Sequence, residues 1–483
     1  MNSNVLNART EQAQIDASAK WPVLAFLGSA LVWLVLGGAL QLAANIQLHT
    51  PSFLADCAWF THGRLAPAAQ NALVYGWGFN AAFAFGLWLM ARLSATTLRH
   101  GGWLFIAAKF WNLGVALGLG GILAGYSTSF ELLEMPRYIT LLLLGAYALI
   151  GVWGVTTFSI RNTENTYASQ WYLFGAAFWF PWIYSIAQVM LFTAPVRGVL
   201  QPVVNAWYVQ ALYSLWFLPV ALAAIYYLLP KLLGRPIRHY YLAPLAFWWF
   251  VVASAFAGGA RLVGSPVPVW IPTLGTVANM ALVLPALIFI LNFLGSLMGR
   301  FSAVGSSLSL RFVLLAIVGL VINLELNLFL SLRGFAEVAQ FTLLGVLRDW
   351  SALYATFSVA IFGAAYFLLP RVTGKEWRSP ALVKAHFGAT VLGVILLTVG
   401  LGAGGWVQGS LLGDPAVSFA DVTAGLSGWH LLNSVGLGVL LAGHLAFLLN
   451  FFWIACPLNS RGTAAITIPV PPAMSLATKE GHA

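Results

Sequence analysis

The chain has 483 residues, of which 60% are hydrophobic and only 7% are charged, and its formal net charge is +10. This composition excludes a water-soluble globular domain, because the charged residues are too few to cover a solvated surface. The placement of the basic residues also excludes nucleic-acid binding as the reason for the positive charge.

Twelve apolar runs follow one another along the chain. Each has about 20 residues or more, which is enough for an α-helix to cross about 30 Å of hydrocarbon. The sequence therefore predicts an all-α integral membrane protein with twelve transmembrane helices. They are expected at residues 22–45, 69–92, 103–125, 137–160, 171–194, 205–229, 240–262, 272–299, 309–333, 347–370, 385–408 and 427–455.

The distribution of Lys and Arg predicts the orientation of these helices. If both termini are cytoplasmic, 16 of the 23 basic residues fall in inner loops and tails, 6 fall on the outer side, and Lys109 lies within the third span. Such an inner excess is typical of bacterial and other multi-pass membrane proteins. We expect a cytoplasmic N-terminal tail (1–21), one membrane domain (22–457) and a flexible cytoplasmic C-terminal tail (458–483).

Charged residues within spans are the first functional candidates, because charge is costly in hydrocarbon. Four of them are Lys109, Glu325, Arg348 and Asp349. Lys109 and Glu325 could form an internal ion pair or extend their charged groups to the interface. The alternative is a path for protons or ions.

The eight histidines do not indicate a metal site. His430 and His444 share the twelfth span, but helical geometry places them about 21 Å apart, too far to ligate one metal ion. Both are predicted to be structural.

Several stretches occur in the order found in one protein family, across nearly all of residues 22–455. They are "HGRLAPAAQNALVYGWGFNA", "GYSTSFELLEMP", "WYVQALYSLWFLP", "FVVASAFAGGARLVGSPVPVW" and "IFGAAYFLLP". Together they resemble the catalytic subunit I of the C-family (cbb-type) heme-copper oxidases. The resemblance implies a heme-copper oxidase subunit I-like bundle in the bacterial cytoplasmic (inner) membrane, with cytochrome c oxidase activity, two haems and one copper in the family.

The histidines that hold these cofactors in the family are replaced at every matching position. The low-spin haem ligand becomes Ala69, the first copper ligand becomes Gln210, and the adjacent copper pair becomes Ala260 and Arg261. The resemblance therefore implies that no haem or copper is bound, since these side chains offer no imidazole.

The tenth-span motif shows the same loss. Arg348 and Trp350 in "RDWSA" stand where two haem-ligating histidines would be, and Ser254 replaces a seventh-span tyrosine. We expect Arg261, Arg348 and Asp349 to pair internally and, with Trp350, to refill the volume of the haems.

The acidic loop after the third span keeps Glu131 and Glu134. They resemble residues that contribute to a calcium site in the family. The alternative is two solvated acids in an outer loop.

Three functions remain open. The first is a redox-silent relative, not catalytic by itself, acting as a structural or assembly subunit of a respiratory membrane complex, with the bilayer and other membrane or cytochrome c subunits as partners. The second is an active terminal oxidase or nitric oxide reductase relative with atypical ligands. The third handles a proton, an anion or a quinone in a polar cavity left by the haems, lined by Lys109, Arg261, Glu325, Arg348 and Asp349.

Overall fold

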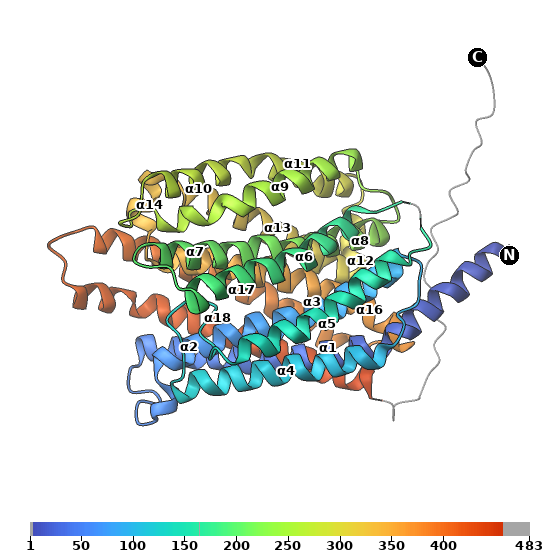
Figure 1. The fold of residues 1–483 in the computed structure, drawn as a ribbon, viewed down its shortest axis with the longest axis horizontal. Coiled ribbons are helices and arrows are strands. Elements are labelled where there is room, and N and C mark those ends of the chain that lie inside the picture. The colour runs from blue at the N-terminus through green and yellow to red at the C-terminus, as the bar shows by residue number, and fades with distance from the viewer. Residues whose placement is uncertain (1–2, 164, 457–483) are drawn as a thin grey trace, which may run out of the picture.

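A computed structural model of the chain describes residues 3–163 and 165–456. Every regular element in these two ranges is a helix, and the long helices run side by side as one bundle (Figure 1). Twelve of them, or pairs and triplets joined end to end, are long and apolar enough to cross a membrane. The predicted all-α fold with twelve spans is confirmed.

The spans differ in whether one helix or several make them up. In chain order, their elements are α1 (Ser3–His49); α2 (His62–Asn71), η2 (Ala72–Gly78) and α3 (Phe79–Leu93); α4 (Gly101–Ala124); α5 (Ile139–Ser159); α6 (Ala168–Gln188) and η3 (Val189–Thr193); α7 (Leu200–Ala211), η4 (Leu212–Phe217) and α8 (Leu218–Leu233); η5 (Tyr240–Leu242), α9 (Ala243–Phe256) and η6 (Ala257–Leu262); α10 (Trp270–Ala281) and α11 (Val283–Leu297); α13 (Leu308–Phe329); α15 (Leu343–Trp350), η7 (Ser351–Ser358) and α16 (Val359–Thr373); α17 (Pro380–Leu412); and α18 (Phe419–Ala455). The connecting helices are η1 (Ala58–Phe60), α12 (Ser302–Ser306) and α14 (Arg333–Ala339).

The first helix begins before the first predicted span. Residues 1–21 were predicted to be a cytoplasmic tail, and α1 is continuous from Ser3 and passes through Pro22. The carboxylate of Asp16 accepts hydrogen bonds from Trp88 Nε1 at 2.8 Å and from Arg92 Nη1 at 3.0 Å, so this polar segment is held against α3. The predicted C-terminal tail, 458–483, lies outside the described residues.

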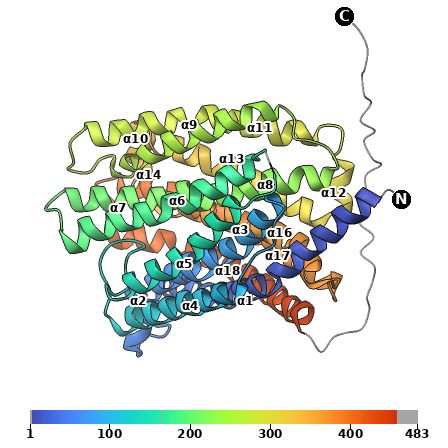
Figure 2. The ribbon, with the colours of Figure 1, turned by 45° about the vertical axis from the view of Figure 1, so that its right-hand side comes forward.

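The bundle has two edges and a centre. Helices α9, α10 and α11 lie along one edge, and α1 and α4 lie along the opposite edge, in both views (Figures 1 and 2). The three spans that contain α3, α8 and α16 are almost wholly buried. We call the end of the bundle where α1 begins the terminal end, and the opposite end, where α2 and α15 begin, the distal end.

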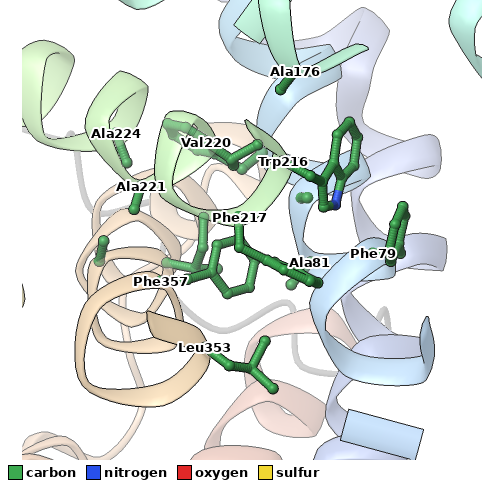
Figure 3. Packing of buried hydrophobic residues seen from close by; sticks show 14 of the residues in the cluster. Phe79, Ala81, Ala176, Trp216, Phe217, Val220, Ala221, Ala224, Leu353 and Phe357 are labelled. Carbon is green, nitrogen blue, oxygen red and sulfur yellow. The ribbon is translucent and has the colours of Figure 1, made fainter. Parts of the chain in front are cut away.

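Aromatic side chains fill the centre where these three spans meet. The Phe217 ring lies between Phe357 and Ala81 (Figure 3), and its centroid is 4.9 Å from that of Phe357. The glycine at position 78 is required for this packing, because a Cβ there would lie 2.5 Å from the Phe217 ring. Close packing of this kind makes the centre rigid.

Each central span contains a π-helical segment, and Phe217 and Phe357 of the aromatic centre lie in two of them. The segments are η2, η4 and η7, and they begin one to three residues after Ala69, Gln210 and Trp350. A π-helical segment inside an α-helix commonly accompanies a functional site.

Candidate functional site

Two guanidinium groups and one carboxylate meet near the distal end. Arg261, at the end of η6, makes a bidentate ion pair with Asp349 of α15; its Nη1 is 3.0 Å from Oδ2, and its Nη2 donates to Oδ1. Arg348 donates from Nε to the same carboxylate at 3.1 Å. The three side chains are only 9 to 13% exposed, so the charges lie in a weakly screened environment where paired geometry counts most.

Neutral amides complete a continuous network around these charges. Gln210 accepts from Arg261 Nε at 3.0 Å and donates to Asn327 Oδ1 at 3.2 Å. Asn327 donates to the carbonyl oxygen of Asn323 at 2.8 Å, and Asn323 donates to that of Arg348 at 2.8 Å. We call Gln210, Arg261, Asn323, Asn327, Arg348 and Asp349 the arginine–amide cluster.

On the side of the amides, the cluster leaves almost no free space. The cavity beside Gln210, Asn323, Asn327 and Asp349 has a volume of about 10 Å³, which is about one water molecule. Gln210 bonds Arg261, and Arg261 and Arg348 both bond Asp349, so these side chains close this part of the bundle.

A much larger cavity lies on the other side of Arg348. Its volume is about 660 Å³, within the range of small-molecule and cofactor sites. It is bordered by α1, α2, η7, α17 and α18, and it reaches α7, η6 and α15; we call it the slot. Its lining includes Gly38, Gln70, Arg348, Trp350, Tyr354, Leu397, Leu401, Asn433, Leu437, Leu440, Leu441 and His444.

The slot is partly aromatic and partly aliphatic. Trp350 stacks on Tyr354, with ring centroids 5.4 Å apart and planes 14° from parallel. The Tyr354 hydroxyl lies 2.6 Å from His444 Nε2. Across from this wall, leucines of α17 and α18 form an apolar surface.

Some polar atoms of the slot have no hydrogen-bond partner within the described residues. They are Nδ1 of His444 and both amide atoms of Asn433, on residues that are only 4% and 1% exposed. Because buried polar groups are normally paired, these atoms indicate a place for water or for a ligand.

The acidic loop lies at the side of the slot. Gln70 donates to Glu131 at 3.4 Å, and Asn71 donates to Glu134 at 2.7 Å. Burial and the nearby Asp349 raise the pKa of Glu131, and burial raises the pKa of Glu134 to about 7. Glu131 and Glu134 are therefore not the solvated acids of the alternative, and each accepts a hydrogen bond from a different amide. Calcium binding stays a prediction.

Two residues predicted to line the polar cavity do not reach it. Lys109 is exposed on the outer face of α4 with its Nζ over the Phe105 ring, and Glu325 is exposed on α13. Lys109 and Glu325 form no ion pair with each other in the ranges that the structure describes, so of the two predicted arrangements the internal pair is not found. Arg261, Arg348 and Asp349 do line the slot.

The charged residues pair internally as expected. Trp350 stacks on Tyr354 at the wall and leaves the slot open. The Trp350 ring lies flat against the Tyr354 ring and so does not extend across the slot. That these side chains refill a haem volume stays a prediction.

The donor groups do not fit the cofactors of the resembled family. Ala69 and Ala260 offer no donor, Arg348 stays protonated, and the Trp350 indole only donates. No group of three or more His, Cys, Asp or Glu residues that could hold a metal ion occurs among the described residues.

Two histidines of the slot differ in burial. His62 is exposed with Nδ1 bonded to the Ala44 carbonyl, whereas His444 is buried and its Nε2 bonds Tyr354.

Sequence reasoning missed Tyr354, Asn433 and His444 as parts of the site. His444 was predicted to be structural, and its bond to Tyr354 agrees with that, but Nδ1 is turned to the slot. The signal available was the helical spacing of Asn433, Leu437, Leu440 and His444, which places polar residues at both ends of an apolar stripe.

Comparisons with known proteins agree with this frame. The model of the family described as Cytochrome C and Quinol oxidase polypeptide I matches residues 22–439. The chain is 23% identical over 434 residues to "Cbb3-type cytochrome c oxidase subunit CcoN1" of Stutzerimonas stutzeri, covering 87% of this chain and 91% of that one. It is 24% identical over 476 residues to "Cytochrome c oxidase subunit 1 homolog" of Azorhizobium caulinodans, covering 93% and 83%.

A solved structure has the same fold. It is described as "Cryo-EM structure of a heme-copper terminal oxidase dimer provides insights into its catalytic mechanism", and the match has a TM-score of 0.74 at 14% identity, covering 90% of this chain and 84% of that one. The predicted heme-copper oxidase subunit I-like bundle is therefore confirmed.

Proposed function

The chain belongs to the Cytochrome C and Quinol oxidase polypeptide I family, and from this premise we propose that it is a redox-silent member, without haem or copper, that serves as a structural or assembly subunit of a respiratory membrane complex. The subunit role is supported by relatives named as oxidase subunits. The frame of twelve spans is kept while the metal-binding residues are replaced.

The arginine–amide cluster is the observation that carries this proposal. Gln210 and Arg261, at two copper-ligand positions of the resemblance, are bonded to each other at 3.0 Å, and Arg261 is also paired with Asp349. A fixed cation placed there repels a metal cation. Restoring a metal would require breaking buried ion pairs that would each leave an uncompensated charge.

An oxidase with atypical ligands has less support. Gln210 uses its oxygen toward Arg261 and its nitrogen toward Asn327, and Asp349 accepts from two guanidinium groups. These candidate replacement ligands are already committed to protein partners.

The distribution of basic residues supports a proposal for the membrane and the orientation of the chain. We propose the bacterial cytoplasmic membrane, with both termini in the cytoplasm and the distal end outside. The inner excess of Lys and Arg supports this orientation.

Absorption spectroscopy with iron and copper analysis tests the redox-silent assignment. The tagged chain is purified in mild detergent from its native membrane, first with its copurifying subunits and then alone. We expect less than about one tenth of a haem or copper per chain in the separated protein. A stoichiometric Soret band on the separated chain would overturn the assignment, and its loss in a His444→Leu variant would then identify the ligand.

Native gel electrophoresis of the same preparation tests the subunit role. We expect the tagged chain to migrate in a complex with membrane or cytochrome c subunits, and deletion of the chain to lower the amount of that complex. Migration as the chain alone, with unchanged respiratory complexes in the deletion strain, would refute this role.

A further inference from the structure

One charged side chain of the slot is only partly hydrogen-bonded. Arg348 donates from Nε to Asp349 at 3.1 Å, and its two terminal nitrogens have no hydrogen-bond partner in the described part of the chain. Arg348 also lines the slot. Leaving a polar group of the interior without a partner is costly, and the cost is higher for a charged group. These two nitrogens therefore lack an acceptor that a ligand in the slot would supply.

The carboxylates that line the slot do not fill this role. Asp349 is already bonded by both terminal nitrogens of Arg261 and by Arg348 Nε. Glu131 accepts from Gln70 at 3.4 Å and forms no ion pair with Arg348 within the described ranges. Burial and the nearby Asp349 raise the pKa of Glu131, so this loop carboxyl is shifted toward its neutral form. An acidic group on a ligand would complete the hydrogen bonds of Arg348.

Aliphatic side chains line another part of the slot. They are Leu397 and Leu401 of α17 and Leu437, Leu440 and Leu441 of α18. Water is a poor filler beside them, because a buried water needs two to four polar partners. A hydrocarbon chain, in contrast, gains free energy when it leaves water for such a surface. The lining therefore combines a cation that has free donors with a surface for an aliphatic chain.

The opening of the slot lies on the same side as the cation. Arg348 precedes Tyr354 by six residues, which is about 9 Å along the helix, and helical side chains lean toward the N-terminal end, here the distal end. At the distal end, the lining residues Leu48, Phe341 and Val346 are 41, 80 and 50% exposed. A head group held by Arg348 would thus stay near the opening while a chain extends inward past Tyr354.

We propose that the slot binds an anionic lipid by one acyl chain, with the acidic head group bonded to Arg348. The volume of about 660 Å³ lies within the range of small-molecule sites. A carboxylate or a phosphate matches the paired N–H groups of a guanidinium. The Asn433 amide, which is 1% exposed and has no partner within the described residues, adds a polar contact. A free fatty acid and an anionic phospholipid share this chemistry.

Native mass spectrometry of the purified, delipidated full chain counts the bound lipid. Oleate and dioleoylphosphatidylglycerol are the anionic probes, and oleyl alcohol, which has the same chain without an acid, is the neutral comparison. We expect about one anionic lipid per chain, bound at least tenfold more tightly than oleyl alcohol. Binding of oleate alone would assign the slot to a free fatty acid, and binding of phosphatidylglycerol alone would assign it to a phospholipid. Equal affinities for oleate and oleyl alcohol, or failure of both anionic probes to bind, would overturn the proposal.

Two variants test whether this lipid occupies the slot. Gly38→Phe places a ring there, since Gly38 lines the slot and a Cβ would meet only Leu441 at 3.5 Å and His444 at 3.8 Å. Arg348→Met removes the proposed partner of the head group. The matched control is Gly120→Phe, at an exposed position of α4 where a Cβ would meet nothing within 4 Å.

We expect oleate to bind at least tenfold more weakly to Gly38→Phe and to Arg348→Met, and to change by less than about twofold in Gly120→Phe. Each variant must elute as a monodisperse peak and unfold cooperatively, so that lost binding is not lost folding. The comparison of oleate with oleyl alcohol uses the wild type and needs no variant. Equal oleate binding in Gly38→Phe and Gly120→Phe would place the lipid on the outer surface and would overturn the proposal.

The carboxyl group near Arg348 tests the charge of the head group. Glu131→Gln removes a repulsion, so we expect oleate to bind about threefold more tightly and oleyl alcohol to be unchanged. The matched control is Glu337→Gln, at an exposed position of α14, which should change neither. Weaker binding of oleate in Glu131→Gln would contradict an anionic head group at this place.

This inference rests on the proposed function only in that the slot must be free of haem. A Soret band on the separated chain would refute the redox-silent assignment. A haem-free chain that binds neither oleate nor phosphatidylglycerol would refute this inference alone.

Discussion

Two neighbouring regions on either side of Arg348 differ in how much space is left between the helices. Beside α7, η4 and α13, the arginine–amide cluster leaves a cavity of about 10 Å³. The slot of about 660 Å³ is bordered by α1, α2, α17 and α18 and reaches Arg261 and Asp349 of the same cluster. The two spaces therefore share a wall but differ greatly in volume.

The difference follows from the chemistry of the replacing residues. Gln210, Arg261 and Asp349 bond one another in fixed geometry, so they draw their helices into a closed network. Ala69 is too small to fill space and Trp350 lies flat on Tyr354. Paired polar side chains thus close one space, while the small Ala69 and the stacked Trp350 leave the other open.

Removing the shared carboxylate should have the largest effect. Asp349→Asn leaves Arg261 and Arg348 buried without a counter-charge, and we expect the free energy of unfolding to fall by about 3–5 kcal/mol. Thermal and denaturant unfolding in detergent measure it. The matched control is Glu325→Gln on the exposed face of α13, which should change stability by less than about 0.5 kcal/mol. Equal effects would mean that the cluster contributes no stability.

The pH dependence of stability tests the acidic loop beside the slot. Burial raises the pKa of Glu134 to about 7 from its usual value of 4.5. The folded protein then binds more protons than the unfolded chain between these two values, so stability falls as pH rises from about 4.5 to about 7 and stays low above that. Glu134→Gln should remove this loss.

We expect Glu134→Gln to be more stable than the wild type by about 2–3 kcal/mol at pH 8 and equally stable below pH 4.5. Unfolding temperatures across this pH range, compared with those of the exposed-site variant Glu337→Gln, measure the effect. A wild-type profile that rises with pH would contradict the assigned direction of the pKa change.

Adding volume to each region compares them directly. Ala352 is 2% exposed and borders the 10 Å³ cavity, so Ala352→Leu should lower the free energy of unfolding by about 1–3 kcal/mol through overpacking. Gly38→Leu points into the slot and should leave stability unchanged or raise it by about 0.5–1 kcal/mol through helix propensity. Similar losses in both variants would show that the slot is as tightly packed as the cluster.

The smallest effect is expected at the deep wall of the slot. Tyr354→Phe removes the hydroxyl that bonds His444 Nε2 and leaves that nitrogen buried, at a cost of about 1–2 kcal/mol. Tyr126→Phe is the control, because Tyr126 is 73% exposed. Equal unfolding temperatures for Tyr354→Phe and the wild type would show that this hydrogen bond contributes no stability.

The sequence alone determined the fold class and the positions of the twelve spans. Apolar runs of bilayer length allow only spanning helices, because backbone groups must be bonded within the segment. The sequence also determined which positions lack metal ligands, since an Ala or a protonated Arg cannot coordinate a metal anywhere in a structure. The helical start at Ser3 could not be read from hydropathy, because it depends on Asp16 meeting Trp88 and Arg92 of α3.

Only the tertiary structure decided which charged residues meet. By their place within apolar spans, Lys109 and Glu325 were candidates for a buried charged site just as Arg348 and Asp349 were. In the structure, Lys109 and Glu325 are exposed, whereas Arg348 and Asp349 form ion pairs in the cluster with Arg261. Residue type fixes what a side chain can bind, but the rotation of each helix about its axis fixes what it faces. That rotation depends on packing against all neighbouring helices at once. It therefore could not be predicted from the sequence of one helix that the slot is open and the cavity beside the arginine–amide cluster is nearly closed.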